Sequence, residues 1–102
     1  MDDAISTYLL DQAIEDGVLV EVFKDMWETL SQGKPIVVTR RLFEDANQHL
    51  LFGVVTQFVR WKTTVMPTLP EEDRLYTDEV KRNKVWVIED TQAITLMYPE
   101  EY

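Results

Sequence analysis

The apolar positions in the middle of the chain recur with the period of a helix. Between residues 40 and 64 they are spaced by three or four, which is typical of one helix face. The stripe consists of Phe43, Ala46, Leu50, Val54, Phe58, Trp61 and Val65, widened by Leu51, Val55 and Val59. Thr39 precedes the stretch and is a suitable N-cap residue. Because little polar surface remains, we predict one long, buried helix over residues 40–64.

The N-terminal part of the chain predicts a short helix followed by an extended run. Ser6 or Thr7 can cap this first helix, since their hydroxyls accept from the unpaired amides of a first turn. Gly17 stands where a residue in the left-handed conformation ends a helix. Residues 18–23 are rich in β-branched side chains, which favours an extended backbone.

A second short helix is expected to begin at Asp25. Glu28 lies three residues later, which is the spacing of a capping box. Gly33 and the proline at 35 follow and are expected to end this helix. Residues 35–38 are then expected to form a brief extended link to the long helix.

The last third of the chain predicts strands. Residues 84–88 and 93–98 are rich in β-branched and aromatic side chains, and the polar residues 89–92 between them suit a hairpin loop. Residues 75–80 are a candidate third strand. Residues 67–73 contain two prolines and three consecutive acids, so a loop is expected there.

These elements together predict an α+β fold. It would contain two short N-terminal helices, one long buried central helix and a small antiparallel sheet that includes a C-terminal hairpin. With 102 residues the chain has the length of a single domain, which we assign to residues 1–102. An apolar content of 45% is sufficient for a packed core.

The net charge of −9 is unevenly distributed. Residues 1–33 carry eight acids and one base, residues 34–66 two acids and five bases, and residues 67–102 nine acids and four bases. An acidic surface repels free nucleic acid and anionic membranes, and it attracts basic protein surfaces. We therefore expect a protein partner with a basic surface, and no direct binding to nucleic acid or membrane. The arginines of the basic middle are expected to pair with the acidic ends.

The sequence contains no pattern of an enzyme, a cofactor site or a metal site. Cysteine is absent, which excludes disulfides and thiolate ligands, and the three glycines are too far apart for a phosphate-binding loop. Most acids stand in adjacent pairs, whose side chains diverge on a helix or a strand. The first three residues, Met1 to Asp3, lack a basic and apolar leader, so a cytoplasmic protein is expected.

One polar strip of the expected long helix offers an alternative. Asp45 and His49 are four residues apart, so on one helix the carboxylate could orient the only imidazole of the chain. Arg60 continues the same strip. A small enzyme or ligand-binding domain using these three residues is therefore a second hypothesis, and an oligomeric assembly subunit built on the wide apolar helix is a third.

Three blocks of the sequence are similar to a family of small proteins of unknown function carried by phages and plasmids. The first block is Ile5–Tyr8 with Gln12–Val22, the second is Pro35–Arg40, and the third is Ile94–Glu101. The resemblance implies a mobile-element setting and brings no activity and no catalytic residues. Small acidic proteins of such elements often bind and block a host protein, in some cases by mimicking DNA.

The leading hypothesis is accordingly a non-catalytic interaction protein of a phage or plasmid. Its partner would be a host protein of defence or nucleic-acid handling, which it would inhibit, with nucleic-acid mimicry as one route. The residues expected to contact this partner are the acids of the C-terminal third: Glu71, Glu72, Asp73, Asp78, Glu79, Glu89 and Asp90.

Overall fold

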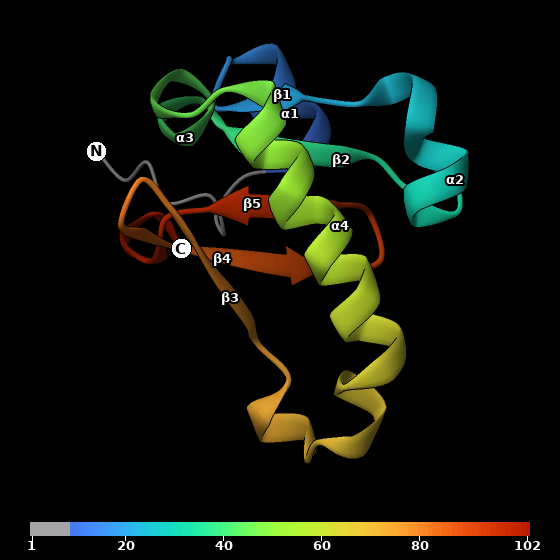
Figure 1. The fold of residues 1–102 in the computed structure, drawn as a ribbon. Helices are drawn as coiled ribbons and strands as arrows, with labels where there is room; N and C mark the ends of the chain where they lie inside the picture. The colour runs from blue at the N-terminus through green and yellow to red at the C-terminus, as the bar shows by residue number, and fades with distance from the viewer. Residues whose placement is uncertain (1–8) are drawn as a thin grey trace.

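The computed structural model describes residues 9–102 and confirms the α+β class (Figure 1). The helices are α1 (Leu10–Glu15), α2 (Trp27–Ser31), α3 (Arg40–Asp45) and α4 (Gln48–Thr64). The strands are β1 (Leu19–Glu21), β2 (Ile36–Thr39), β3 (Tyr76–Val80), β4 (Asn83–Glu89) and β5 (Ile94–Met97). Short 3-10 turns are η2 (Lys24–Met26), η3 (Met66–Thr68), η4 (Glu71–Asp73) and η5 (Pro99–Glu101). The expected caps Ser6 and Thr7 lie outside the described residues.

Within residues 9–102 the strands form one sheet in the order β1-β2-β5-β4-β3. The expected hairpin is present, because β4 and β5 pair antiparallel, and the third strand is confirmed as β3 on the outer edge. The sheet is mixed, however, and not wholly antiparallel, since β2 runs parallel to β5 with Ile36 opposite Ile94.

The extended backbone expected at residues 35–38 is confirmed for residues 36–38, but the expectation of a mere link is wrong, because these three residues belong to β2, an interior strand of the sheet. All four residues of β2 are buried, as is usual for a strand covered on both faces. Its neighbours are β1 on one side and β5 on the other. The unbroken apolar run from Ile36 to Val38 was the local signal for this position.

The two faces of the sheet are covered by different helices. Helix α4 crosses the front face in Figure 1, where Leu51, Val55 and Phe58 pack with side chains of β2, β4 and β5 in the main core. Successive side chains of a strand alternate between faces, so Val37 points to the other side. There it packs with Ala13 of α1 in a second, smaller cluster.

The single helix predicted over residues 40–64 is wrong, because two helices occupy this stretch. Ala46 is extended, with φ −113° and ψ 166°, and it separates α3 from α4. Asn47 caps α4 with a side-chain oxygen 2.8 Å from the amide nitrogen of Leu50. Asparagine is among the strongest N-cap residues, so this cap competes with continuation of the helix. The predicted cap at Thr39 is confirmed, and it begins α3.

The glycines supply a first stability test. Gly33 follows α2 with φ +88°, a conformation that residues with a Cβ adopt only at a cost, whereas Gly53 is helical and nothing lies within 4 Å of a Cβ built on it. Gly33→Ala should lower the free energy of unfolding by about 1 kcal/mol. Gly53→Ala should raise it by roughly 0.5–1 kcal/mol. Urea denaturation followed by circular dichroism measures both; changes of the same sign would contradict this description of α2 and α4.

Candidate functional site

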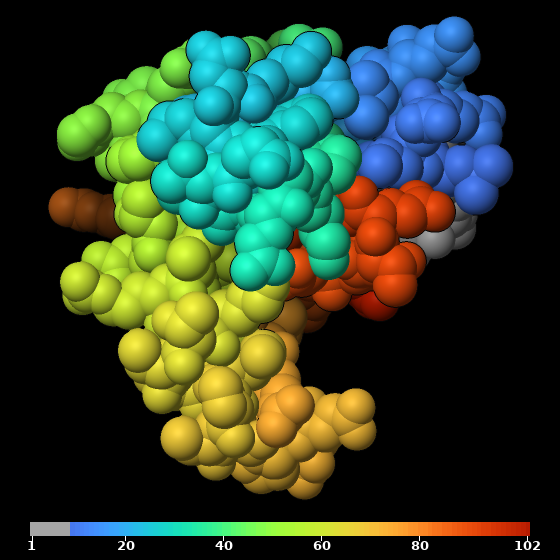
Figure 2. Space-filling model, turned by 90° about the vertical axis from the view of Figure 1, so that its right-hand side faces the viewer, coloured from blue at the N-terminus to red at the C-terminus, as the bar shows by residue number. Residues whose placement is uncertain are grey.

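A surface notch lies between the β4–β5 hairpin and the segment that joins α4 to β3. Figure 2 shows it as the hollow between the orange hairpin turn and the gold residues of η3 and η4. Its volume is about 460 Å³. The lining combines an apolar floor, which includes Phe58, Trp61 and Met66, with three basic side chains, Lys34, Lys62 and Arg74. Two carboxylates, Glu89 and Asp90, stand on the hairpin side.

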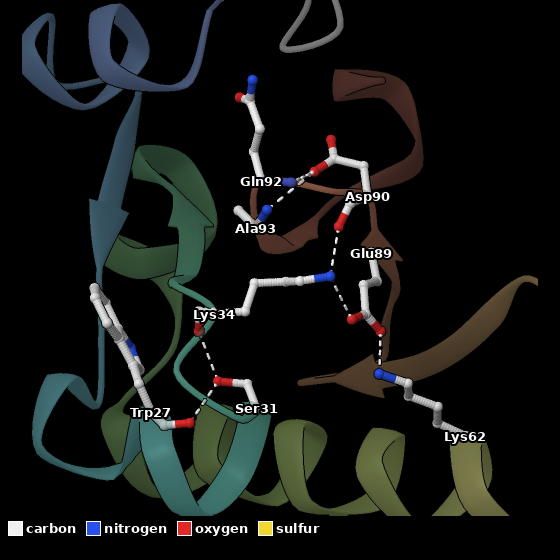
Figure 3. Close-up of polar contacts among 8 residues, drawn as sticks. All are labelled: Trp27, Ser31, Lys34, Lys62, Glu89, Asp90, Gln92 and Ala93. Carbon is white, nitrogen blue, oxygen red and sulfur yellow. Dashed lines mark hydrogen bonds and ion pairs between the residues drawn. The ribbon is translucent and has the colours of Figure 1, made fainter.

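Glu89 is held between two lysines that are distant in the sequence. Its Oε2 lies 2.7 Å from Nζ of Lys34, and its Oε1 lies 2.7 Å from Nζ of Lys62 (Figure 3). The Glu89 side chain is only 20% exposed. Burial alone would raise the pKa of Glu89, but the hydrogen bonds and charges of the two lysines outweigh it and hold this pKa below its usual value. The carboxylate therefore stays ionised and fixes both ammonium groups at the notch.

The main chain of Lys34 is positioned by the preceding helix. Ser31 lies in the last turn of α2, where its hydroxyl oxygen is 2.6 Å from the carbonyl oxygen of Lys34 and 2.9 Å from that of Trp27 (Figure 3). The lysine side chain then reaches across to the hairpin. There its Nζ also donates to the carbonyl oxygen of Asp90 at 2.7 Å.

The hairpin turn is stabilised by Asp90 itself. Its Oδ1 accepts hydrogen bonds from the amides of Gln92, at 2.8 Å, and Ala93, at 3.0 Å. An aspartate that bonds the amides after it is a common way to fix a tight turn. The side chain of Asp90 thus shapes the notch wall, although the residue remains exposed.

The floor of the notch rests on an aromatic cluster. The ring centroid of Trp61 lies 6.0 Å from that of Phe58 and 5.4 Å from that of Tyr76 on β3. Such contacts hold Trp61 in one position, and it stays only partly buried at the notch. Arg74 comes from the opposite wall, where its Nε donates to the carbonyl oxygen of Leu69 at 2.9 Å.

The acids expected to contact a partner do not form one surface. Glu71, Glu72 and Asp73 form η4, are all exposed, and form no ion pair in the described part of the chain. Figure 1 shows that the η3–η4 segment projects beyond the sheet. Glu89 and Asp90 lie across the notch from η4, and Glu89 is engaged by its two lysines.

Asp78 and Glu79 lie elsewhere, on the edge strand β3. Asp78 accepts a hydrogen bond from the hydroxyl of Tyr76 at 2.7 Å and another from the amide of Glu79 at 2.7 Å. Burial, followed by this bond to Asp78, raises the pKa of Tyr76. Both acids line a shallow depression of about 290 Å³ beside α4, together with His49.

The structure does not bring Asp45, His49 and Arg60 together as the second hypothesis requires. The helix break places Asp45 at the end of α3, where it accepts a hydrogen bond from the hydroxyl of Tyr98 at 2.7 Å. His49 is exposed in the first turn of α4, and Arg60 is exposed three turns later. The carbonyl oxygen of Arg60 accepts hydrogen bonds from the hydroxyls of Thr63 and Thr64. Neither its guanidinium nor the imidazole of His49 bonds to another of the described residues.

The pairing expected between the basic middle and the acidic ends is confirmed for Arg41, which lies 2.9 Å from Glu100. Lys34 and Lys62 make the same kind of long-range pair with Glu89. The notch itself has no signal in the sequence. Its bases are 28 and 12 residues apart along the chain, so no local motif marks them.

Comparisons with known proteins add no relative: no protein-family model matches the chain, and neither the curated proteins nor the solved structures yield a match. Among residues 9–102, no group of three or more histidines and acids has a geometry that could hold a metal ion. In the same part of the chain, no helix has the length and apolar character needed to cross a membrane.

Proposed function

We propose that this chain is a non-catalytic, cytoplasmic interaction protein of a phage or plasmid. Its partner is a host protein that acts in defence or in nucleic-acid handling, and our chain binds a basic surface of that protein. Blocking this surface would inhibit the host protein, with the carboxylates taking the place of nucleic-acid phosphates.

The observation that carries this proposal is the unpaired acidic turn η4. Glu71, Glu72 and Asp73 are consecutive, exposed and free of ion pairs among the described residues, on a segment that projects from the body. Three like charges on one turn repel each other, and a basic partner would relieve this repulsion. Leu75 follows closely and is 41% exposed, so an apolar contact is available beside the charges.

A capture experiment tests the proposal. Tagged protein is incubated with host lysate at low and high salt, and bound proteins are identified by mass spectrometry. We expect a stoichiometric partner that is lost at high salt, because exposed charges are screened by ions. The affinity of the purified partner is then measured with and without competing DNA. Recovery of no partner, or of one that DNA does not displace, would contradict inhibition at a nucleic-acid-binding surface.

Charge reversal of η4 should abolish most of this binding. In the variant Glu71→Lys, Glu72→Lys, Asp73→Lys, we expect the affinity for the partner to fall by about a hundredfold, since like charges then face each other. The matched control reverses three exposed acids on and next to α1, Asp11, Glu15 and Asp16, and so changes the net charge equally. Equal losses in both variants would show that overall charge, and not η4, governs binding.

A further inference from the structure

The interior of the notch differs in charge from the rest of the protein. Three of the ten bases of the chain line this one notch, against two acids, while the whole chain carries −9. One of the two acids, Glu89, already bonds both lysines. The notch is thus a locally cationic site on an acidic protein, and the projecting acids of η4 do not explain it.

Several donors at the notch have no partner among the described residues. An ammonium group carries three N–H donors; Nζ of Lys62 uses one on Glu89, and Nζ of Lys34 uses two on Glu89 and Asp90. Arg74 uses only its Nε, on the carbonyl oxygen of Leu69, which leaves its terminal nitrogens for a ligand. These terminal nitrogens form the planar fork that binds carboxylates and phosphates with two parallel hydrogen bonds.

The floor beside these donors suits a flat apolar group. Trp61 is partly buried, is held by Phe58 and Tyr76, and lines the notch together with Met66 and Val87. Ligand sites of about 300–1,000 Å³ usually combine such an apolar floor with a few convergent polar groups. The notch, at about 460 Å³, has the size and the composition of such a site.

We propose that the notch binds a small aromatic anion, whose ring packs on Trp61 and whose phosphate or carboxylate is held by Arg74 and Lys62. The site lies beside η4 without including Glu71, Glu72 or Asp73, and the inference does not depend on the proposed function. Its ligand is defined by shared chemistry, a planar ring joined to an anionic group, which a nucleoside monophosphate or an aromatic carboxylate supplies.

The indole resonances of the protein allow a direct test. The chain has three tryptophans, so a ¹⁵N-labelled sample gives three indole N–H signals. Trp86 alternates with Val85 and Val87 on β4 and so points to the opposite face of the sheet, and the indole of Trp27 is bonded to the carbonyl oxygen of Val22. Only the signal of Trp61 should move when a ligand enters the notch.

The full chain is titrated with adenosine 5′-monophosphate and, separately, with indole-3-acetate. We expect a saturable shift of the Trp61 signal with a dissociation constant of about 1 mM or below for at least one of them. Binding of only the first identifies a phosphate ligand, and binding of only the second a carboxylate ligand. Adenosine has the ring but no anionic group, and inorganic phosphate has the anionic group but no ring. Each should bind at least about tenfold more weakly than the complete ligand.

Arg74→Gln should weaken the binding by about tenfold or more, because it removes the charged fork. Arg60→Gln makes the same chemical change on the exposed side of α4 and should have no effect. Arg74→Lys, which keeps the charge, should bind with intermediate strength and also shows whether the η3–η4 segment tolerates replacement. No shift of Trp61 with either anion up to about 5 mM would overturn the proposal. Equal binding by Arg74→Gln and the wild type would overturn it as well.

Discussion

Leu96→Ala should lower the free energy of unfolding by about 3 kcal/mol, which is the largest effect that we expect from one core side chain. Leu96 is fully buried in β5, opposite Val38 of β2 and Val87 of β4. It belongs to the main core that α4 covers. Truncation therefore leaves a cavity whose walls belong to three strands and a helix, and these cannot all move inward.

The measurement is urea denaturation followed by far-ultraviolet circular dichroism. Leu75→Ala is the matched control, because this leucine is 41% exposed and should cost less than about 0.5 kcal/mol. Leu96→Met keeps the volume and should cost less than about 1.5 kcal/mol, so it remains measurable even if the alanine variant does not fold. A loss in Leu96→Ala no larger than in Leu75→Ala would show that β5 is not central in the fold.

Glu89→Gln should lower the free energy of unfolding by about 2 kcal/mol. This value lies between the usual losses on breaking an exposed and a buried ion pair, because the Glu89 side chain is 20% exposed. The change leaves the partly buried ammonium groups of Lys34 and Lys62 close together without the carboxylate between them. Glu100→Gln is the control, since Glu100 and its partner Arg41 are both more than half exposed. We expect this control to lose less than about 0.5 kcal/mol.

The pH dependence provides a second readout for Glu89. Because its pKa is lower in the folded chain than the usual 4.5, the folded state favours the ionised form. The stabilisation by Glu89 should be complete above pH 4.5 and should be lost as the pH falls through the lowered pKa. The difference between wild type and Glu89→Gln should therefore shrink below pH 4.5. A difference that stays constant from pH 7 to the acid transition would exclude the ion pairs as its cause.

The elements that the sequence predicted correctly are those with a local signal. The apolar period over the second half of residues 40–64 placed Leu51, Val54, Val55 and Phe58 on one face, and all four are buried. Two runs rich in β-branched and aromatic residues, with a polar turn between them, predicted the C-terminal hairpin. Val65, the last residue of the predicted stripe, was expected to be buried. It is 41% exposed instead, because it lies at the C-terminal end of α4.

The elements that were predicted wrongly depend on contacts between distant residues or on competing local signals. The apolar run from Ile36 to Val38 is compatible with a buried strand, but its place inside the sheet depends on β5, almost sixty residues later, which pairs with β2 in parallel. The break between α3 and α4 arose from a competing local signal, the Asn47 cap. Loss of that single helix removed the alignment of Asp45 with His49, because the i, i+4 relation holds only within one helix.

The features of the candidate sites also fall into two groups, those that the sequence determines and those that depend on tertiary contacts. The sequence by itself determined that the chain is acidic, lacks cysteine and carries three consecutive acids at residues 71–73, since these are properties of composition and order. Only the tertiary structure decided that Glu89 is neutralised by two lysines, and that Arg74 lines the same notch as Trp61. It also shows that η4 has no ion pair within residues 9–102. The physical reason is separation along the chain: Lys34 and Glu89 are 55 residues apart, and only the parallel pairing of β2 with β5 brings them within 2.7 Å.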